Sequence, residues 1–419
     1  MVYRPRVIDA AVERSLGAVG AVLIEGVRAC GKTETGAHHS RSVVRFDTDD
    51  VARELAELAP ERVLRGAVPR LLDEWQLVPK IWNHVRRVVD DRKAPGQFIL
   101  TGSARPADDV TRHSGAGRIL RLRMRPMSLL ESGRSTGGVS LKALVDGGIA
   151  DGVSLLEISD LADVLCLGGW PGLQRMTPDA AQDVLRSYLD DVARVDMPAL
   201  DGRQRDFARI RRVLAAYARH VATPAAIRTI TADAMGADRP EGESVHPTTT
   251  SDYLTVLERV MVVEEQKSWG PHLRSRDVVR KASIRHFVDP SLAVAAMGGS
   301  PDRLLGDPRA FGLLFESLVI RDLRVYTQPF DGEVLHYRDA AGAEADAIIQ
   351  LRDGRWAAIE VKLGESRVEE AVTSLERLVA KIDTARAGEP VARIVITGGR
   401  YAYTRPDGVH VVPLGCLAP

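Results

Sequence analysis

The segment GVRACGKT, at residues 26–33, constrains the fold of this chain more than any other stretch. It fits the pattern GxxxxGK[ST] without a mismatch, and it follows the short apolar run VGAVLIE at residues 19–25. A buried strand, a glycine-rich turn and a helix start in this order allow backbone N–H groups to surround a phosphate at a helix N-terminus. We therefore expect a parallel sheet that holds a nucleotide at one edge.

The positions of this segment have expected roles at a nucleotide. Lys32 reaches the β- and γ-phosphates, and the hydroxyl of Thr33 binds Mg²⁺. ATP and Mg²⁺ are accordingly the expected cofactors. The alternative is a glycine-containing strand–helix turn without a ligand. The residues expected to line the phosphates are Gly26, Val27, Arg28, Ala29, Cys30, Gly31, Lys32 and Thr33.

A pair of carboxylates closes another short apolar run, RLLDEWQ at residues 70–76. An acid at the C-terminal end of a strand, here Asp73, suits a water-mediated contact with Mg²⁺, and the adjacent Glu74 suits activation of the attacking water. The alternative is a helix N-cap acid with a neighbour that the helix dipole stabilises. The upstream phosphate-type loop favours the first interpretation.

The run GQFILTGSA, at residues 96–104, carries hydroxyls where its strand is expected to end. Ligand-facing groups of an open parallel sheet lie at such strand ends, so either Thr101 or Ser103 is a candidate sensor of the γ-phosphate. Phosphoryl transfer also needs positive charge. Arg105 and the alternating RILRLRMR stretch can supply it, although the pattern of that stretch is equally typical of a strand with a solvated basic face. The candidate arginines are Arg105, Arg118, Arg121 and Arg123.

A second constellation lies in the last third of the chain. Glu360 and Lys362 belong to the apolar run WAAIEVK, and period-two alternation places them on one face of a strand. Asp346 lies near the start of the preceding run, ADAIIQL, and Glu316 lies on an expected helix before both. Carboxylates from these positions, Glu316, Asp346 and Glu360, suit a Mg²⁺ ion beside a scissile phosphate, and the lysine suits activation of water.

This arrangement of an acid followed by E-x-K on an adjacent strand resembles the PD-(D/E)xK nuclease superfamily. The sequence departs from that pattern because Ala345, not proline, precedes Asp346. The alternative is a surface salt-bridge ladder, in which each exposed pair contributes about 0.2–1 kcal/mol.

The motifs together resemble a family of bacterial AAA-type ATPases whose C-terminal half is an uncharacterised nuclease-like domain. The stretches that carry this resemblance are GVRACGKT, LLDEWQ, ILTGSA, RMRPMSLLE, GGWPGL, FESLVIRDL, EADAIIQL and IEVK. The resemblance implies nucleotide and Mg²⁺ roles for Lys32, Thr33, Asp73 and Glu74. It also implies a homo-oligomer in which Arg118 acts as a finger on a neighbouring subunit.

The expected fold class is α/β with several domains, since strand and helix patterns alternate at both ends of the chain. Residues 1–135 are expected to form an AAA-type P-loop ATPase domain with a parallel sheet, and residues 136–200 a helical lid. The helix TTTSDYLTVLERV and the β-like run MVVEEQ indicate a winged-helix-like region over residues 201–300. Residues 301–419 are expected to form an α/β restriction-nuclease-like domain.

The amino-acid composition limits the kinds of partner that the chain is expected to bind. Lys+Arg and Asp+Glu both number 57, so the net charge is zero, which argues against nucleic-acid binding through bulk charge but not through local basic surfaces. Two arginine-rich segments, at residues 203–212 and 274–281, are candidates for such surfaces. Three widely spaced cysteines, a charged start and the lack of long apolar runs favour a cytoplasmic protein without a membrane anchor.

The expected function is ATP binding and hydrolysis coupled to a nuclease-like C-terminal domain that acts on nucleic acid. The alternative is a nucleotide-dependent regulatory or scaffold protein whose nuclease-like domain is an inert module that captures a protein partner. A third interpretation is a DNA-binding switch that acts through the winged helix.

Overall fold

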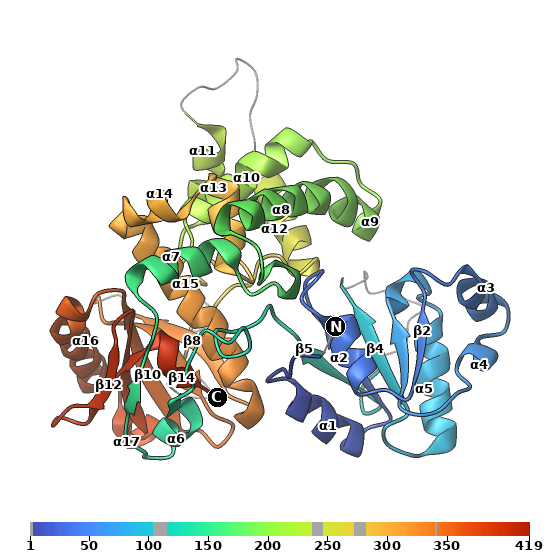
Figure 1. Cartoon of the computed structure of the whole chain (residues 1–419), viewed down its shortest axis with the longest axis horizontal. Coiled ribbons are helices and arrows are strands. Elements are labelled where there is room, and N and C mark those ends of the chain that lie inside the picture. Colours follow the sequence, from blue (N-terminus) through green and yellow to red (C-terminus); the bar gives the residue numbers. More distant parts are fainter. Residues whose placement is uncertain (1–2, 104–114, 237–245, 272–281, 340–341) are drawn as a thin grey trace.

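The computed structural model describes residues 3–103, 115–236, 246–271, 282–339 and 342–419. The two larger β-sheets lie at opposite ends of the molecule, and a block of helices from the middle of the chain lies above both of them in the view of Figure 1. None of the helices in these ranges has the length and apolar character that crossing a bilayer demands.

The N-terminal sheet contains five parallel strands in the order β2-β3-β4-β1-β5. Apolar side chains from alternating positions bury both of its faces, so the predicted parallel sheet is confirmed. Its elements are α1 Asp9–Ala18, β1 Ala21–Glu25, α2 Lys32–His38, β2 Ser42–Arg45, α3 Asp50–Leu58, α4 Pro60–Val63, β3 Arg70–Asp73, η1 Trp75–Leu77, α5 Ile81–Arg92, β4 Phe98–Gly102 and β5 Ile119–Arg123.

The middle of the chain is mostly helical. Three helices, α10 to α12, are followed by two antiparallel bridges, Val263 with Phe287 and Gln266 with Ile284. This is the order expected for the winged-helix-like region, but α13 packs on α8 and α10 and so ties the region to the rest of the helical block. The elements are α7 Ile158–Leu167, η2 Pro171–Leu173, α8 Pro178–Asp191, the π-helix η3 Val192–Asp196, α9 Met197–Asp201, α10 Phe207–Arg219, α11 Ile227–Met235, α12 Pro247–Arg259, α13 Pro290–Met297 and α14 Pro301–Leu305.

The C-terminal sheet has seven strands in the order β7-β12-β13-β11-β10-β9-β8. Helix α15 packs on one face and α16 on the other. Strand β10 pairs antiparallel with β9 and parallel with β11. The elements are α15 Pro308–Tyr326, η5 Gln328–Phe330, β8 Glu333–Arg338, β9 Glu344–Gln350, β10 Trp356–Lys362, η6 Glu365–Arg367, α16 Val368–Lys381, α17 Thr384–Ala387, β11 Ala392–Thr397, β12 Tyr401–Thr404, β13 Val409–Pro413, η7 Leu414–Cys416 and β14 Leu417–Ala418.

The prediction that residues 136–200 form a helical lid is wrong for the first part of that range. Strand β6 (Val139–Ser140) pairs with β14, and β7 (Asp151–Val153) extends the C-terminal sheet by pairing with β12; the short α6 (Leu141–Val145) lies between them. The chain therefore contributes to the C-terminal sheet before it builds the helical block. Strand partners so distant along the chain leave no local pattern, since pairing depends on the folded arrangement.

Helix α15 ties the three parts of the molecule together. Its Arg321 is buried and pairs with Asp289, which precedes α13, at 2.8 Å and with its own neighbour Asp322 at 2.7 Å. The second oxygen of Asp322 accepts the backbone N–H of Leu129, just after the N-terminal sheet, at 3.0 Å. The hydroxyl of Tyr326 accepts the backbone N–H of Leu130 at 3.1 Å. Removal of one partner would leave charges without compensation in the interior.

Candidate functional site

The loop between β1 and α2 has the backbone shape that its glycines predict. Gly31 has a φ of 104°, in the left-handed region that glycine adopts without strain. Ala29 also has a positive φ, 62°, which costs a non-glycine residue energy. A Cβ atom on Gly26 would lie 2.2 Å from the carbonyl oxygen of Met124, so only glycine fits there. Cys30 is fully buried, and its backbone N–H donates to the carbonyl of Val27 at 3.4 Å.

Lys32 begins α2 and is only 4% exposed. Its Nζ donates a hydrogen bond to the carbonyl oxygen of Val27 at 2.9 Å, so the ammonium bridges the loop on its concave side. A buried ammonium needs strong acceptors, and a phosphate oxygen is a stronger acceptor than a neutral carbonyl. The lysine is therefore positioned where a phosphate would take over its hydrogen bond.

Asp73, at the end of β3, collects two hydroxyls from neighbouring elements. Its carboxylate is 2% exposed and accepts hydrogen bonds from Thr33 Oγ1 at 2.9 and 3.1 Å. Thr101, at the end of β4, donates to the same carboxylate at 2.5 Å. The structure thus brings together Thr33 and Asp73, the two residues expected to hold Mg²⁺. Thr101 is fully buried, and its hydroxyl is bound to this carboxylate.

Glu74 follows with a backbone φ of 53°, a conformation that costs a non-glycine residue energy and that clusters at functional sites. Its carboxylate accepts hydrogen bonds from Gln76 and, at 3.4 Å, from Ser103. Burial raises the pKa of Glu74, while the nearby Lys32 acts in the opposite direction. Of the two candidate sensors, Ser103 is the one beside this acid.

Arg118 lies at the N-terminal ends of the strands, whereas the phosphate-type loop lies at their C-terminal ends. Its carbonyl accepts the N–H of Ala21, the first residue of β1, whereas the loop follows the last residue of that strand. Its guanidinium pairs with Asp90 at 2.8 Å. Arg118 therefore cannot serve the site of its own chain, because the length of the strand separates them, and only the expectation of a finger for a neighbouring subunit remains. Arg105 lies outside the described residues.

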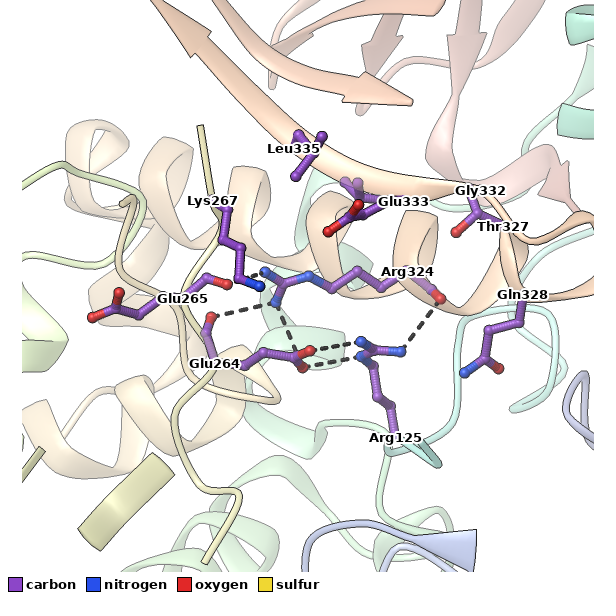
Figure 2. A pocket seen from close by; sticks show the side chains of 11 residues that line it. Arg125, Glu264, Glu265, Lys267, Arg324, Thr327, Gln328, Gly332, Glu333 and Leu335 are labelled. Carbon is purple, nitrogen blue, oxygen red and sulfur yellow. Dashed lines mark hydrogen bonds and ion pairs between the residues drawn. The ribbon is translucent and has the colours of Figure 1, made fainter. Parts of the chain in front are cut away.

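A residue in contact with the loop that the sequence did not suggest is Arg6. Its buried guanidinium donates to the carbonyl of Cys30 at 2.9 Å and to that of Arg125 at 2.8 Å, and it pairs with Glu131 at 3.0 Å. It thereby fixes the phosphate-type loop to the segment after β5. Arg125 continues this chain of contacts and pairs with Glu264 at 2.6 Å in a pocket shared by all three parts of the molecule (Figure 2). No local pattern marked these residues, since their partners are distant along the chain.

The C-terminal constellation also comes together in space. The register of β9 and β10 places Asp346 beside Glu360, and Glu316 approaches from α15 closely enough for the carboxylates to repel one another. Glu360 is 2% exposed; it pairs with Lys362 at 3.1 Å and accepts the hydroxyl of Ser374 at 3.0 Å. The interpretation as an exposed salt-bridge ladder is therefore wrong.

The protonation of this cluster reflects its burial. Desolvation, followed by the charge of Asp346, raises the pKa of Glu360 to about 8. Burial also raises the pKa of Asp346 and, well above its ordinary value, that of Glu316. Desolvation is the largest cause of all three shifts, and Lys362 opposes them. Carboxylate oxygens are the type of ligand that Mg²⁺ prefers, and a divalent cation would favour their ionised form. Among the described residues, however, no three Asp, Glu, His or Cys side chains are already arranged around a metal position.

The basic segments are less available than their sequence suggested. Arg205 pairs with both Asp201 and Asp252, and Arg211 pairs with Asp190. These charges are neutralised within the helical block and do not form a free basic surface. The second arginine-rich segment, at residues 274–281, lies outside the described residues.

A parallel sheet that ends in a glycine-rich loop, a buried lysine and an acid–hydroxyl cluster is the arrangement of a P-loop ATPase-like domain. Residues 19–132 match the family described as an AAA domain. Residues 158–303 match a domain of unknown function, DUF8612, and residues 311–417 match another, DUF4143. The nuclease-like character of the C-terminal domain therefore stays a prediction.

The relatives resemble the whole chain. Uncharacterized proteins Mb2031c of Mycobacterium bovis and Rv2008c of Mycobacterium tuberculosis are each 24% identical over 421 residues, which cover 99% of this chain and 84% of theirs. Among solved structures, the Orc1 protein of Aeropyrum pernix in complex with DNA is 14% identical and covers 73% of this chain and 94% of its own. Its TM-score of 0.25 does not establish a common arrangement.

Proposed function

We propose that the protein binds ATP with Mg²⁺ at the loop of residues 26–33 and hydrolyses it. Lys32 binds the β- and γ-phosphates, Thr33 and Asp73 hold the metal, and Glu74 accepts a proton from the attacking water. The observation that carries this proposal is the carboxylate of Asp73, which accepts the hydroxyls of both Thr33 and Thr101 beside the buried lysine. Ser103 is the proposed sensor of the γ-phosphate.

The test is retention of labelled ATP and release of phosphate by the purified full chain. We expect Lys32→Ala to abolish both, since no other ammonium is built into the loop. Lys80→Ala is the matched control, because Lys80 is an exposed lysine of the same domain that pairs with Glu57. Equal ATP retention by wild type and Lys32→Ala would refute the proposal.

A second function is proposed for the C-terminal cluster: metal-dependent cleavage of nucleic acid, coupled to the ATPase. It is favoured by Glu360 and Lys362, which form a buried pair beside two further carboxylates and not an exposed ladder. Glu316, Asp346 and Glu360 would bind Mg²⁺, which would supply Lewis-acid stabilisation of a scissile phosphate, and Lys362 would orient water beside it.

This second function is tested with labelled DNA and RNA in Mg²⁺ or Mn²⁺, with and without ATP. We expect cleavage by wild type and by Lys381→Ala, a control with an exposed lysine that pairs with Asp339. Glu360→Ala and Lys362→Ala should be inactive.

If wild type cuts neither nucleic acid, the C-terminal domain is the inert module of the regulatory or scaffold alternative. Capture of a protein partner in the presence of ATP but not of ADP would support that alternative. DNA binding that survives Lys362→Ala would instead support a winged-helix switch.

We also propose a cytoplasmic homo-oligomer in which Arg118 of one subunit approaches the nucleotide of the next. The exposed guanidinium at the edge of the sheet remote from its own loop supports this arrangement.

A further inference from the structure

The helical block touches the phosphate-type loop directly. The hydroxyl of Tyr188, on α8, donates to the carbonyl of Arg28 at 3.5 Å, and its ring packs on Trp170 with centroids 5.2 Å apart. A Cβ atom on Gly31 would lie 3.6 Å from Pro171. Elements that belong to a different part of the chain therefore form one wall of the loop.

The loop also has an ion pair with this wall. Arg28 Nη1 lies 3.5 Å from Asp196 Oδ1, and the two side chains are 54% and 25% exposed. Burial raises the pKa of Asp196 and the neighbouring Asp191 raises it further, whereas Arg28 opposes both. The guanidinium is thus the counter-ion of a partly buried carboxylate, yet it belongs to the loop that would surround a triphosphate.

Asp196 lies on an irregular stretch of helix. It is the last residue of the π-helix η3, which interrupts the continuous helix formed by α8 and α9. Pro198 follows two residues later and cannot donate a backbone hydrogen bond to the preceding turn, and its ring crowds that turn. A wider turn relieves this conflict, and such π-bulges are frequent at functional sites. This irregular stretch contacts the loop through the ion pair between Asp196 and Arg28.

We propose that Arg28 exchanges Asp196 for the triphosphate of ATP, so that filling of the loop releases η3 and α9 from it. A polyanion attracts a guanidinium more strongly than one carboxylate at 3.5 Å, and arginine binds phosphate oxygens with two parallel N–H groups. The exchange rests on the proposed nucleotide site. It makes Asp196 a competitor of ATP and Arg28 the residue through which the helical block senses the nucleotide.

The exchange predicts opposite effects for its two partners. Asp196→Asn frees the guanidinium and lowers the Kd of ATP by about two- to fivefold, the size expected for a partly exposed ion pair. Arg28→Ala raises the Kd by about tenfold or more, because a charge-assisted hydrogen bond to phosphate is lost. In the double variant, Asp196→Asn should have no effect, since no guanidinium remains to be freed.

The experiment is a titration of each full-length variant with a fluorescent ATP analogue in Mg²⁺. Asp191→Asn is the matched control, because it removes the same charge from an exposed position on the adjoining helix end and leaves Arg28 paired. Asp196→Asn must tighten binding more than this control does. A thermal unfolding curve for each variant separates loss of the fold from loss of binding.

The outcomes are distinguishable from those of the proposed function. If wild type binds ATP and Lys32→Ala does not, but Asp196→Asn equals Asp191→Asn or weakens binding, the exchange is refuted and the nucleotide site stands. If Asp196→Asn tightens binding equally with and without Arg28, bulk charge is the cause and the exchange is likewise refuted. If wild type binds no ATP, both proposals fall.

Discussion

Thr33, at the start of α2, donates its hydroxyl to Asp73, forty residues further along the chain at the end of β3, at 2.9 Å. The two residues lie on neighbouring elements at the C-terminal edge of one parallel sheet. A hydroxyl that is already oriented by a buried carboxylate is prepared to present its lone pair to a cation, and the carboxylate in turn tunes that ligand.

Asp73→Asn should therefore weaken Mg²⁺ binding. We expect the Mg²⁺ concentration needed for half-maximal ATPase activity to rise by about 10–100-fold, as loss of an outer-shell partner of a metal ligand commonly produces. The measurement is ATPase rate against Mg²⁺ concentration. Asp47→Asn, which changes an exposed acid just after β2, should leave the curve in place; an identical curve for Asp73→Asn would contradict the metal role.

Glu74→Gln should separate binding from hydrolysis. The amide keeps the size of the side chain but cannot accept a proton, so kcat should fall by about 10²–10⁴-fold while ATP retention is unchanged. Because burial raises the pKa of Glu74, wild-type activity should decline on acidification at a higher pH than for an ordinary glutamate. A pH–rate profile checks this, and a Gln76→Ala variant, which removes one hydrogen bond to the ionised form, should move the decline to higher pH still.

Arg118→Ala should leave ATP binding intact, since the residue lies across the sheet from its own loop. A finger that acts on a neighbouring subunit makes the specific ATPase activity of wild type rise with protein concentration, because subunits then assemble. The Arg118→Ala variant should not show this rise. Arg87→Ala, an exposed arginine on α5, is the control. Mixing Arg118→Ala with Lys32→Ala should restore part of the activity, because one subunit then supplies the finger and the other the nucleotide site; no restoration would argue against a finger in trans.

The pKa of Glu360, raised to about 8 in the folded chain, predicts a pH dependence of stability. Between the ordinary glutamate pKa and about pH 8, the unfolded chain releases a proton that the folded chain retains, so the contribution of this group is full in acid and is lost as pH rises. Glu360→Gln should flatten the decline of the unfolding free energy between pH 5 and about 8 relative to wild type. Urea titrations at several pH values test this, and the exposed Glu376→Gln should behave as wild type.

Arg321→Met should be strongly destabilising. The guanidinium is the counter-ion of two fully buried carboxylates, Asp289 and Asp322, and breaking such a buried network costs about 3–5 kcal/mol. Urea unfolding measures the loss. Arg386→Met, at an exposed arginine of α17, should leave the unfolding curve unchanged, and a similar stability for both variants would show that the network contributes little.

What the sequence determined by itself is local. The turn of residues 26–33, the strands around it, and the strand carrying Glu360 and Lys362 were predictable because spacing, glycine positions and alternation act between residues that are close along the chain. The AAA match over residues 19–132 agrees with the first of these predictions. The roles of Thr101 and Ser103 stayed open because both hydroxyls fit the same strand end.

What only the tertiary structure decided is long-range. It joined residues 151–153 to the C-terminal sheet and residues 139–140 to β14, and it placed Arg118 away from its own loop. It also brought Arg6, from the start of the chain, and Asp196, from the helical block in the middle of the chain, against the loop. Strand pairing and buried ion pairs depend on which distant surfaces meet once the whole chain packs. No window of neighbouring residues contains that information, since the partner of each group lies far away along the sequence.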